Sequence, residues 1–338
     1  GDYASMRDAA LRTMDLAEAA QQTELGLRAM QRLAVALTYL GDADRGRDIA
    51  EKGLQTSRDH ADLPMEALFL NALSVIADAQ SDQVATLEYD MLDLEINQKI
   101  GNRRNEAIAL TNLGHGWLQL GDSVTARHYL EQGLQLAQQL RDRGTEPNIL
   151  TALSVLDLRE GKSDNALRKA QLASDLAATF DNPDFASIAL CAKANAYLDL
   201  GLLGDAKNTF DSAIAATGGS APMKCWDAQA GLARVALSTN DMATAITVVN
   251  AILEQSNQTE KLDGSEAPNL VRLACIQVLD RAKDPRANIL LETSCSKLLA
   301  SASMLSNAKL RAHFLNDIPE HAALLSRSSG HPGTASRQ

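Results

Sequence analysis

The stretch that decides the fold is Asn112-Leu113-Gly114-His115-Gly116-Trp117-Leu118-Gln119-Leu120-Gly121-Asp122. Its apolar residues recur at helical spacing, and Gly121-Asp122 is typical of a helix end followed by the cap of the next helix. A fixed period in the range of 20 to 50 residues predicts a helical solenoid. The same turn returns at steps of about 40 residues, at Leu40-Gly41-Asp42, Gln80-Ser81-Asp82, Glu160-Gly161, Leu200-Gly201 and Thr239-Asn240-Asp241.

The period predicts an all-α, right-handed superhelix of about seven antiparallel helical hairpins with a C-terminal capping helix. We expect residues 1–20 to be the second helix of a truncated repeat and residues 21–305 to be the superhelical domain. Residues 306–325 should form the capping helix, and residues 326–338 a disordered tail. The chain begins at Gly1 without a methionine, within the repeat register, which favours a piece of a longer protein. Proline is expected to open first helices at Pro64, Pro147, Pro183 and Pro222.

Small residues at fixed places in the repeat explain how the two helices of a hairpin approach each other. Gly114 and Ala126 are expected to lie on facing surfaces, since side chains no larger than a methyl allow close helix packing. Larger residues such as Leu113 and Trp117 then fill the space around this contact. The counterparts of Ala126 are Gly46, Ala166 and Ala206, with Ala245 one residue early.

Composition excludes several classes of protein. The formal net charge of −11 and the pI near 5.0 argue against a nucleic-acid surface, because phosphate binding needs clustered Lys and Arg. The four cysteines form no CxxC pair, so buried free thiols are expected in place of a zinc site or disulfides. No apolar run of membrane-spanning length and no leader is visible in the sequence. We therefore expect a soluble, cytoplasmic chain.

Leu113, Gly114, Trp117 and Ala126 together resemble the tetratricopeptide repeat pattern of a large residue, a small residue, an aromatic and an alanine. The 40-residue period resembles the longer repeats of sensor regions in bacterial signalling ATPases, including activators of the maltose-regulator kind. Spindle-orientation adaptors have a similar long repeat. The segment from His313 to His321 is similar to the ending of tetratricopeptide tails in bacterial ATPase-linked cyclases and kinases.

The resemblance implies a protein-interaction or sensor module of a larger bacterial signalling or transcription-regulatory protein. Such a module would bind a peptide, protein partner or effector in its concave groove and regulate an attached effector domain. The alternative function is a free-standing scaffold that only assembles partners. The sequence departs from the family pattern where Ser81 and Asn240 replace turn glycines, and in the weak second, sixth and seventh repeats.

Catalytic and metal sites are not expected. Gly161-Lys162-Ser163 has the ending of a phosphate-binding loop, but Leu156 stands where that loop requires glycine. His313, Asp317, Glu320 and His321 could be taken for metal ligands, but Pro319 interrupts the helix that would align them, which favours a capped helix end. His115 is interpreted as a groove residue and not as a catalytic base. We predict no enzyme activity, no cofactor and no metal.

Function is expected on the concave face, which the first helix of each hairpin lines in this repeat class. A polar groove with apolar columns fits an extended peptide or a partner helix. The partner would be a protein or peptide, an intramolecular ATPase or effector domain included; a small-molecule effector is an open alternative, and neither nucleic acid nor membrane is expected. The predicted binding residues are Arg28, Gln31, Asn71, Thr111, His115, Gln119, Thr151, Arg159, Asn195 and Asp199.

Overall fold

The computed structural model describes residues 2–180, 182–218, 225–256, 262 and 265–329, which contain seventeen helices and no strand. The prediction of an all-α chain of helical hairpins is confirmed. The chain divides into a first unit, Gly1–Trp117 with His128–Asp142, and a second unit, Leu118–Arg127 with Arg143–Gln338. None of the helices that the structure describes is long and apolar enough to span a membrane.

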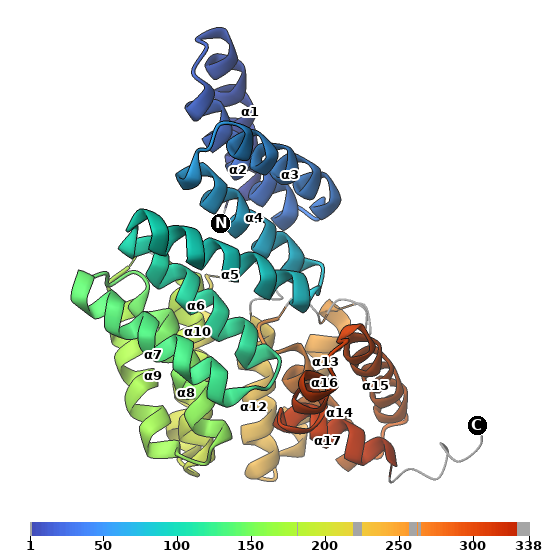
Figure 1. Cartoon of the computed structure of the whole chain (residues 1–338). Coiled ribbons are helices and arrows are strands. Elements are labelled where there is room, and N and C mark those ends of the chain that lie inside the picture. The colour runs from blue at the N-terminus through green and yellow to red at the C-terminus, as the bar shows by residue number, and fades with distance from the viewer. Residues whose placement is uncertain (1, 181, 219–224, 257–261, 263–264, 330–338) are drawn as a thin grey trace. The chain divides into compact units, whose positions relative to one another are not determined.

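The first unit consists of helices joined by short turns, so that consecutive helices run antiparallel (Figure 1). Two of its helices, α6 and α7, continue into the second unit at the turn that joins them. The helices are α1 (Tyr3–Ala19), α2 (Thr23–Tyr39), α3 (Ala43–Asp59), α4 (Leu63–Ala79), α5 (Gln83–Ile100), α6 (Arg103–Gln119) and α7 (Ser123–Leu140).

The second unit continues the hairpin pattern and ends in two shorter helices. Its helices are α8 (Glu146–Arg159), α9 (Ser163–Ala177), α10 (Pro183–Asp199), α11 (Leu203–Ala216), α12 (Trp226–Ser238), α13 (Met242–Gln255), α14 (Pro268–Arg281), α15 (Arg286–Met304), α16 (Ala308–Asn316) and α17 (Pro319–Ser329). The even-numbered helices from α2 to α14 are the first helices of their hairpins.

Most of the turns that the structure describes contain one residue with a left-handed backbone, and up to Gly201 these residues recur about every 20 positions, half the period expected from the sequence. The glycines among them adopt this conformation without steric cost, whereas the other residues are strained. An aspartate often follows and caps the next helix: Asp122 Oδ1 accepts from the backbone N–H of Thr125 at 3.0 Å. The left-handed residues are Gln21, Gly41, Ala61, Ser81, Gly101 and Arg141 in the first unit, and Gly121, Gly161, Gly201, Gly218, Asn240 and Lys283 in the second.

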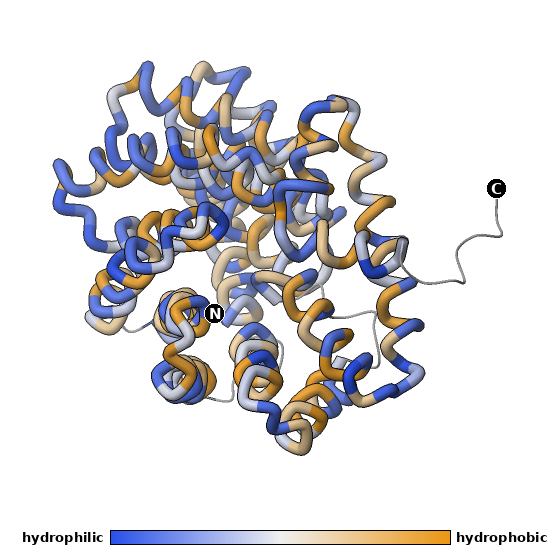
Figure 2. Tube along the Cα trace, turned by 90° about the horizontal axis from the view of Figure 1, so that it is seen from below, coloured by the Kyte–Doolittle hydropathy of each residue, from blue (hydrophilic) through white to orange (hydrophobic). Residues whose placement is uncertain are grey.

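Small residues on one helix receive large residues from the helix adjacent to it in sequence. In the first unit a Cβ at Gly53 would meet the Phe69 ring at 2.1 Å, and one at Gly114 would meet Leu130 at 2.5 Å. In the second unit Gly231 accommodates the Phe210 ring in the same way. Apolar and polar residues alternate along the helices (Figure 2), a pattern that allows a helix to bury one face.

The C-terminal region differs from the expectation. The single capping helix over residues 306–325 is two helices, α16 and α17, because Pro319 cannot continue α16 and instead opens α17. Helix α17 extends to Ser329, so residues 326–329 are helical and not part of a disordered tail. The rest of that tail, residues 330–338, and the helix start expected at Pro222 lie outside the described residues.

Candidate functional site

In the first unit, the predicted binding residues lie on α2, α4 and α6. Arg28 is exposed and donates to Glu24 Oε1 at 2.9 Å, one helical turn earlier. Gln31, Asn71 and His115 are half-buried, and burial lowers the pKa of His115. Thr111 is only 5% exposed, and its hydroxyl donates to the backbone carbonyl of Ala107 within its own helix, so it offers no surface to a ligand.

In the second unit, the predicted residues lie on α8 and α10 and at the end of α6. Gln119 is exposed, and Thr151 is buried at 8% exposure. Arg159 Nη1 donates to the Leu118 carbonyl at 2.8 Å, and the hydroxyl of Ser163 donates to Asp199 Oδ2. Arg159 and Asp199 are thereby held in place by neighbouring helices.

Two residues near Asn195, namely Arg234 and Gln277, were not predicted from the sequence. Arg234 Nη1 donates to Asn195 Oδ1 at 2.7 Å, which joins α12 to α10. Asn195 lies six residues before the left-handed residue Gly201, and Arg234 lies six residues before its equivalent, Asn240. Gln277 holds the same position before Lys283.

Arg234 and Gln277 line a pocket in the second unit with a volume of about 290 Å³, and Asn195 is joined to it through its hydrogen bond with Arg234. Three first helices, α10, α12 and α14, contribute to it near their C-terminal ends. Its lining is mainly polar, with two leucines beside the charged and amide groups. The lining residues are Leu198, Asp199, Arg234, Leu237, Ser238 and Gln277.

Two largely buried guanidinium groups set the electrostatics of this region. Burial lowers the pKa of Arg234, and the carboxylates of Glu320 and Asp199 oppose that effect at longer range. No described carboxylate forms an ion pair with Arg234. Burial likewise lowers the pKa of Arg159, opposed by Glu320, whose Oε1 lies 3.8 Å from Arg159 Nη2. A buried cation without a close counter-charge favours a site that an anionic or strongly accepting group can complete.

The histidines near the C-terminus have protein partners. His313 Nδ1 pairs with Asp317, one turn later in the same helix. His321 Nδ1 faces the Phe314 carbonyl at 2.7 Å, and its Nε2 faces the amide of Asn269 at 2.8 Å. In the part of the chain that the structure describes, no group of three or more His, Cys, Asp or Glu residues could hold a metal ion.

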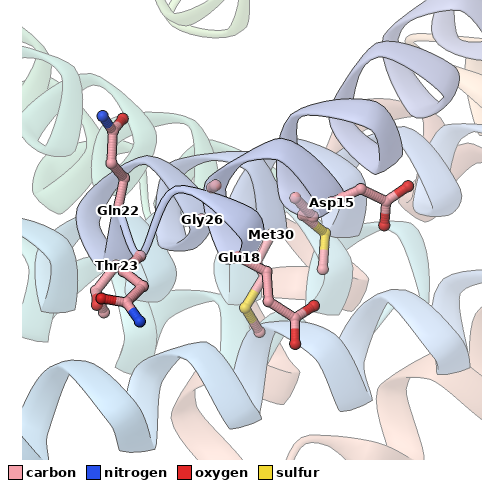
Figure 3. A pocket seen from close by; sticks show the side chains of 9 residues that line it. Asp15, Glu18, Gln22, Thr23, Gly26 and Met30 are labelled. Carbon is pink, nitrogen blue, oxygen red and sulfur yellow. The ribbon is translucent and has the colours of Figure 1, made fainter.

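A second pocket, of about 470 Å³, lies between α1 and α2 in the first unit (Figure 3). Asp15 and Glu18 come from α1, and Thr23, Gly26 and Met30 come from α2. The pocket is shallow and lined by no basic residue. It offers apolar contact at Met30, but its polar lining residues are all exposed, so it is a weaker candidate than the pocket at Arg234.

The cysteines show no sign of reactivity. Cys225, Cys275 and Cys295 are buried, Cys191 is half-buried, and all four are free thiols. Burial raises the pKa of Cys275 to about 12 and that of Cys191 higher still. Both therefore stay protonated near neutral pH and are poor nucleophiles.

No family model and no curated protein matches the sequence. Solved structures do match. A Rap protein complexed with Competence and Sporulation Factor has a TM-score of 0.62 at 12% identity, over 97% of this chain and 99% of that one. NprR in complex with its cognate peptide NprX has a TM-score of 0.56 at 14% identity, over 97% and 98%. BtubC from P. vanneervenii has a TM-score of 0.54 at 18% identity, over 66% and 94%.

The fold is that of the tetratricopeptide-like repeat proteins. At these identities the likeness shows the fold alone, and it confirms the resemblance carried by Leu113, Gly114, Trp117 and Ala126. The narrower resemblance to sensor regions of bacterial signalling ATPases stays a prediction.

Proposed function

We propose that the chain binds a peptide, or an extended segment of a partner protein, through the first helices of its hairpins. Polar recognition takes place in the second unit, at the pocket between α10, α12 and α14. The observation that carries this proposal is the alignment of Asn195, Arg234 and Gln277 at one repeat position, beside a polar pocket and with Arg234 lacking an ion pair.

The chemistry of these groups suits a peptide backbone. The amides of Asn195 and Gln277 each carry donors and an acceptor, so they can pair with both the N–H and the C=O of an extended segment. The guanidinium of Arg234 adds donors for a carbonyl or carboxylate. Leu198 and Leu237 give an adjoining side chain apolar contact.

The size of the pocket favours a peptide over a free small molecule. Its volume of about 290 Å³ lies at the low end of the roughly 300–1,000 Å³ usual for enclosed small-molecule sites. It is also open, so it would surround a small molecule poorly. One or two side chains of a longer ligand fit this space, while the rest of that ligand gains contacts on neighbouring helices.

Two of the structurally similar proteins add support. The Rap structure is described as complexed with Competence and Sporulation Factor, and the NprR structure as complexed with its cognate peptide NprX. Both likenesses extend over 97% of this chain. A peptide ligand is therefore compatible with the whole described fold and not only with one hairpin.

A regulatory role follows if peptide binding changes the populations of two states of an attached or separate effector. This part of the proposal rests on the sequence resemblance to sensor regions. Its test is the parent protein with and without residues 1–338: the activity of the effector, and its response to ligand, should change on deletion. An effector that keeps both would leave the scaffold function in its place.

The binding proposal is tested by selecting random-sequence peptides displayed on phage against the wild-type chain. Peptides that are enriched should bind in isothermal titration and lose about tenfold or more in affinity against Arg234→Met, since a buried hydrogen bond to a charged group contributes about 1.5–3 kcal/mol. The matched control is Arg168→Met, an arginine on the exposed side of α9.

Two outcomes would contradict the proposal. One is the failure of any peptide to be enriched over an unrelated helical-repeat protein. The other is enrichment of peptides that bind Arg234→Met and Arg168→Met as tightly as the wild type.

A further inference from the structure

Residues 308–320, which comprise α16 and the corner up to Glu320, lie against Gly121 and Arg159 of the second unit. A Cβ at Gly121 would lie 2.6 Å from the carbonyl oxygen of His313 and 3.1 Å from Ile318 Cγ1. The turn glycines Gly161 and Gly201 have nothing within 4 Å of the same position. Within the second unit, Gly121 is therefore the turn glycine that must remain small for a second reason, the close approach of this C-terminal segment.

Glu320 brings a carboxylate from this segment to the buried guanidinium groups. It lies 3.8 Å from Arg159, and the two side chains are only 19% and 14% exposed. Its charge also favours the charged form of Arg234, as does that of Asp199. Glu320 thus supplies the anionic group that the site would otherwise take from a ligand.

The attachment of this segment is uneven. None of the nine residues of α16 is buried; Arg311 donates to the carbonyls of Ala302 and Leu305, and the Phe314 carbonyl faces His321 of α17. Ile318, at the corner, is 2% exposed. By contrast α17 buries Leu324 completely in the core of the second unit. Residues 308–320 can therefore lift while the rest of α17 stays docked.

We propose that residues 308–320 are a displaceable strap, which in the free protein places Glu320 against Arg159 and competes with an acidic peptide for the guanidinium groups of Arg159 and Arg234. This inference rests on the proposed function and names its regulation. A ligand that displaces the strap must compensate Arg159 and Arg234 after Glu320 leaves, so peptides with an acidic side chain fit best. Binding then frees α16, whose change of position reports that the site is occupied.

The strap is tested in the full chain with the peptide selected on phage, by hydrogen exchange and mass spectrometry of residues 308–320. The peptide should increase exchange there while it protects α10 and α12. Glu320→Gln should tighten peptide binding by about threefold to tenfold, because the apparent affinity rises with the fraction of molecules whose site is open.

Gly121→Ala and Gly161→Ala form a matched pair. Both place alanine at a positive φ, +83° and +70°, but only the first meets the strap. Gly121→Ala should raise exchange in residues 308–320 and tighten peptide binding, and Gly161→Ala should do neither.

The outcomes separate this inference from the proposed function. A peptide that binds at the pocket, yet leaves exchange of residues 308–320 unchanged and binds Glu320→Gln no more tightly, overturns the strap and leaves the binding function standing. Equal exchange in Gly121→Ala and Gly161→Ala also overturns it. Failure to select any peptide overturns the binding function first, and the strap with it.

Discussion

Each first helix is followed by a turn residue with a left-handed backbone, and we compare the residues six positions before it. In the first unit these are Val35, Val75 and His115. In the second unit the same position holds Val155, Asn195, Arg234 and Gln277. At this repeat position, the first unit has mainly apolar residues, whereas the second unit has valine first and then three polar residues. The backbone repeat is the same in both, so the ligand chemistry is set by this position and not by the fold.

The buried faces of two second helices, α5 in the first unit and α9 in the second, show the opposite contrast: here the first unit is the more polar. In the second unit, α9 packs Ala166, Ala170, Ala173 and Ala177 inward. In the first unit, the equivalent positions of α5 are all polar: Thr86, Asp90, Asp93 and Asn97, each no more than 6% exposed. Helix α5 thus carries polar groups inside the first unit at the positions where α9 carries alanines inside the second.

The buried polar face of α5 reduces the stability of the first unit. Burial raises the pKa of both Asp90 and Asp93 to about 7, and each carboxyl is further affected by a neighbouring acid. Ser74 and Asn112 face Asp90 without hydrogen-bond geometry, so neither carboxylate oxygen has a hydrogen-bond partner in the described chain. The repeat therefore tolerates these polar groups inside α5 at the expense of stability, whereas the alanines of α9 carry no such cost.

The largest effect is expected when the polar core is transferred to the second unit. Ala170→Asp places a carboxylate at the position of Asp90 among alanines, and should reduce the free energy of unfolding by on the order of 3 kcal/mol or more. Urea unfolding followed by the fluorescence of Trp226, with Trp117 replaced by phenylalanine, measures it. Leu172→Asp, at an exposed position of α9, is the control, and an equal loss there would contradict the comparison.

A smaller loss is expected from overpacking the second unit. Ala206 is completely buried on α11, so Ala206→Leu should destabilise the unit by about 1–3 kcal/mol. Lys207→Leu adds a similar side chain on the exposed side of the same helix and should change the melting temperature little. If both variants melt with the wild type, the packing register is wrong.

Replacing Asp90 is expected to stabilise the first unit by an amount that depends on pH. The folded pKa of Asp90 and Asp93, about 7, is above the usual 3.8, so protons bind more tightly to the folded unit. The resulting stabilisation is fully present below about pH 4 and is lost as the pH rises through 7. Asp90→Asn is neutral at every pH and should stabilise the unit at pH 8, by on the order of 1–2 kcal/mol or more, less at pH 5 and hardly at all below about pH 4.

The fluorescence of Trp117, in a chain whose Trp226 is phenylalanine, reports this gain. Asp78→Asn removes an exposed acid that also raises the pKa of Asp90, and should give a smaller gain at pH 8. A gain for Asp90→Asn that is the same at pH 5 and pH 8 would show that the carboxyl is not the cause.

The smallest effect concerns backbone strain in the first unit's turns. Ala61 has φ of +52°, which costs a side-chain-bearing residue about 1–2 kcal/mol, so Ala61→Gly should stabilise the unit by about 1 kcal/mol. Gly41→Ala makes the reverse change at φ +88°, where an added Cβ has no other atom within 4 Å. It should reduce the free energy of unfolding by a similar amount. Shifts of the same sign in both variants would contradict this.

The sequence predicted the hairpins because the turn glycines and the alanines of the packing face recur at 40 residues. It did not show the 20-residue recurrence of the left-handed turn, because Gln21, Ala61 and Arg141 carry side chains where glycine is expected. The interval between equivalent turns also changes after Gly201, to Asn240 and then Lys283. Steps of 40 residues therefore did not identify Arg234 and Gln277. Alignment on Asn240 would have identified Arg234, but Lys283 gives no such signal for Gln277.

The contact of residues 308–320 with Gly121 could not have been predicted from repeat positions. It joins segments nearly two hundred residues apart and depends on the direction in which α16 leaves α15. Burial of Thr111 and Thr151 was missed for a related reason, since their exposure depends on packing and not on their place in the repeat.

The central claim, that polar recognition lies in the second unit, is tested most directly by the affinity of the selected peptide for two double variants. We predict that Asn195→Ala/Arg234→Ala weakens binding by about tenfold or more, a loss of roughly 1.4 kcal/mol per decade. Asn71→Ala/His115→Ala, which removes the polar groups of the first unit's first helices, should change the affinity by less than about threefold. Equal losses in the two variants, or a larger loss in the second, would contradict the account.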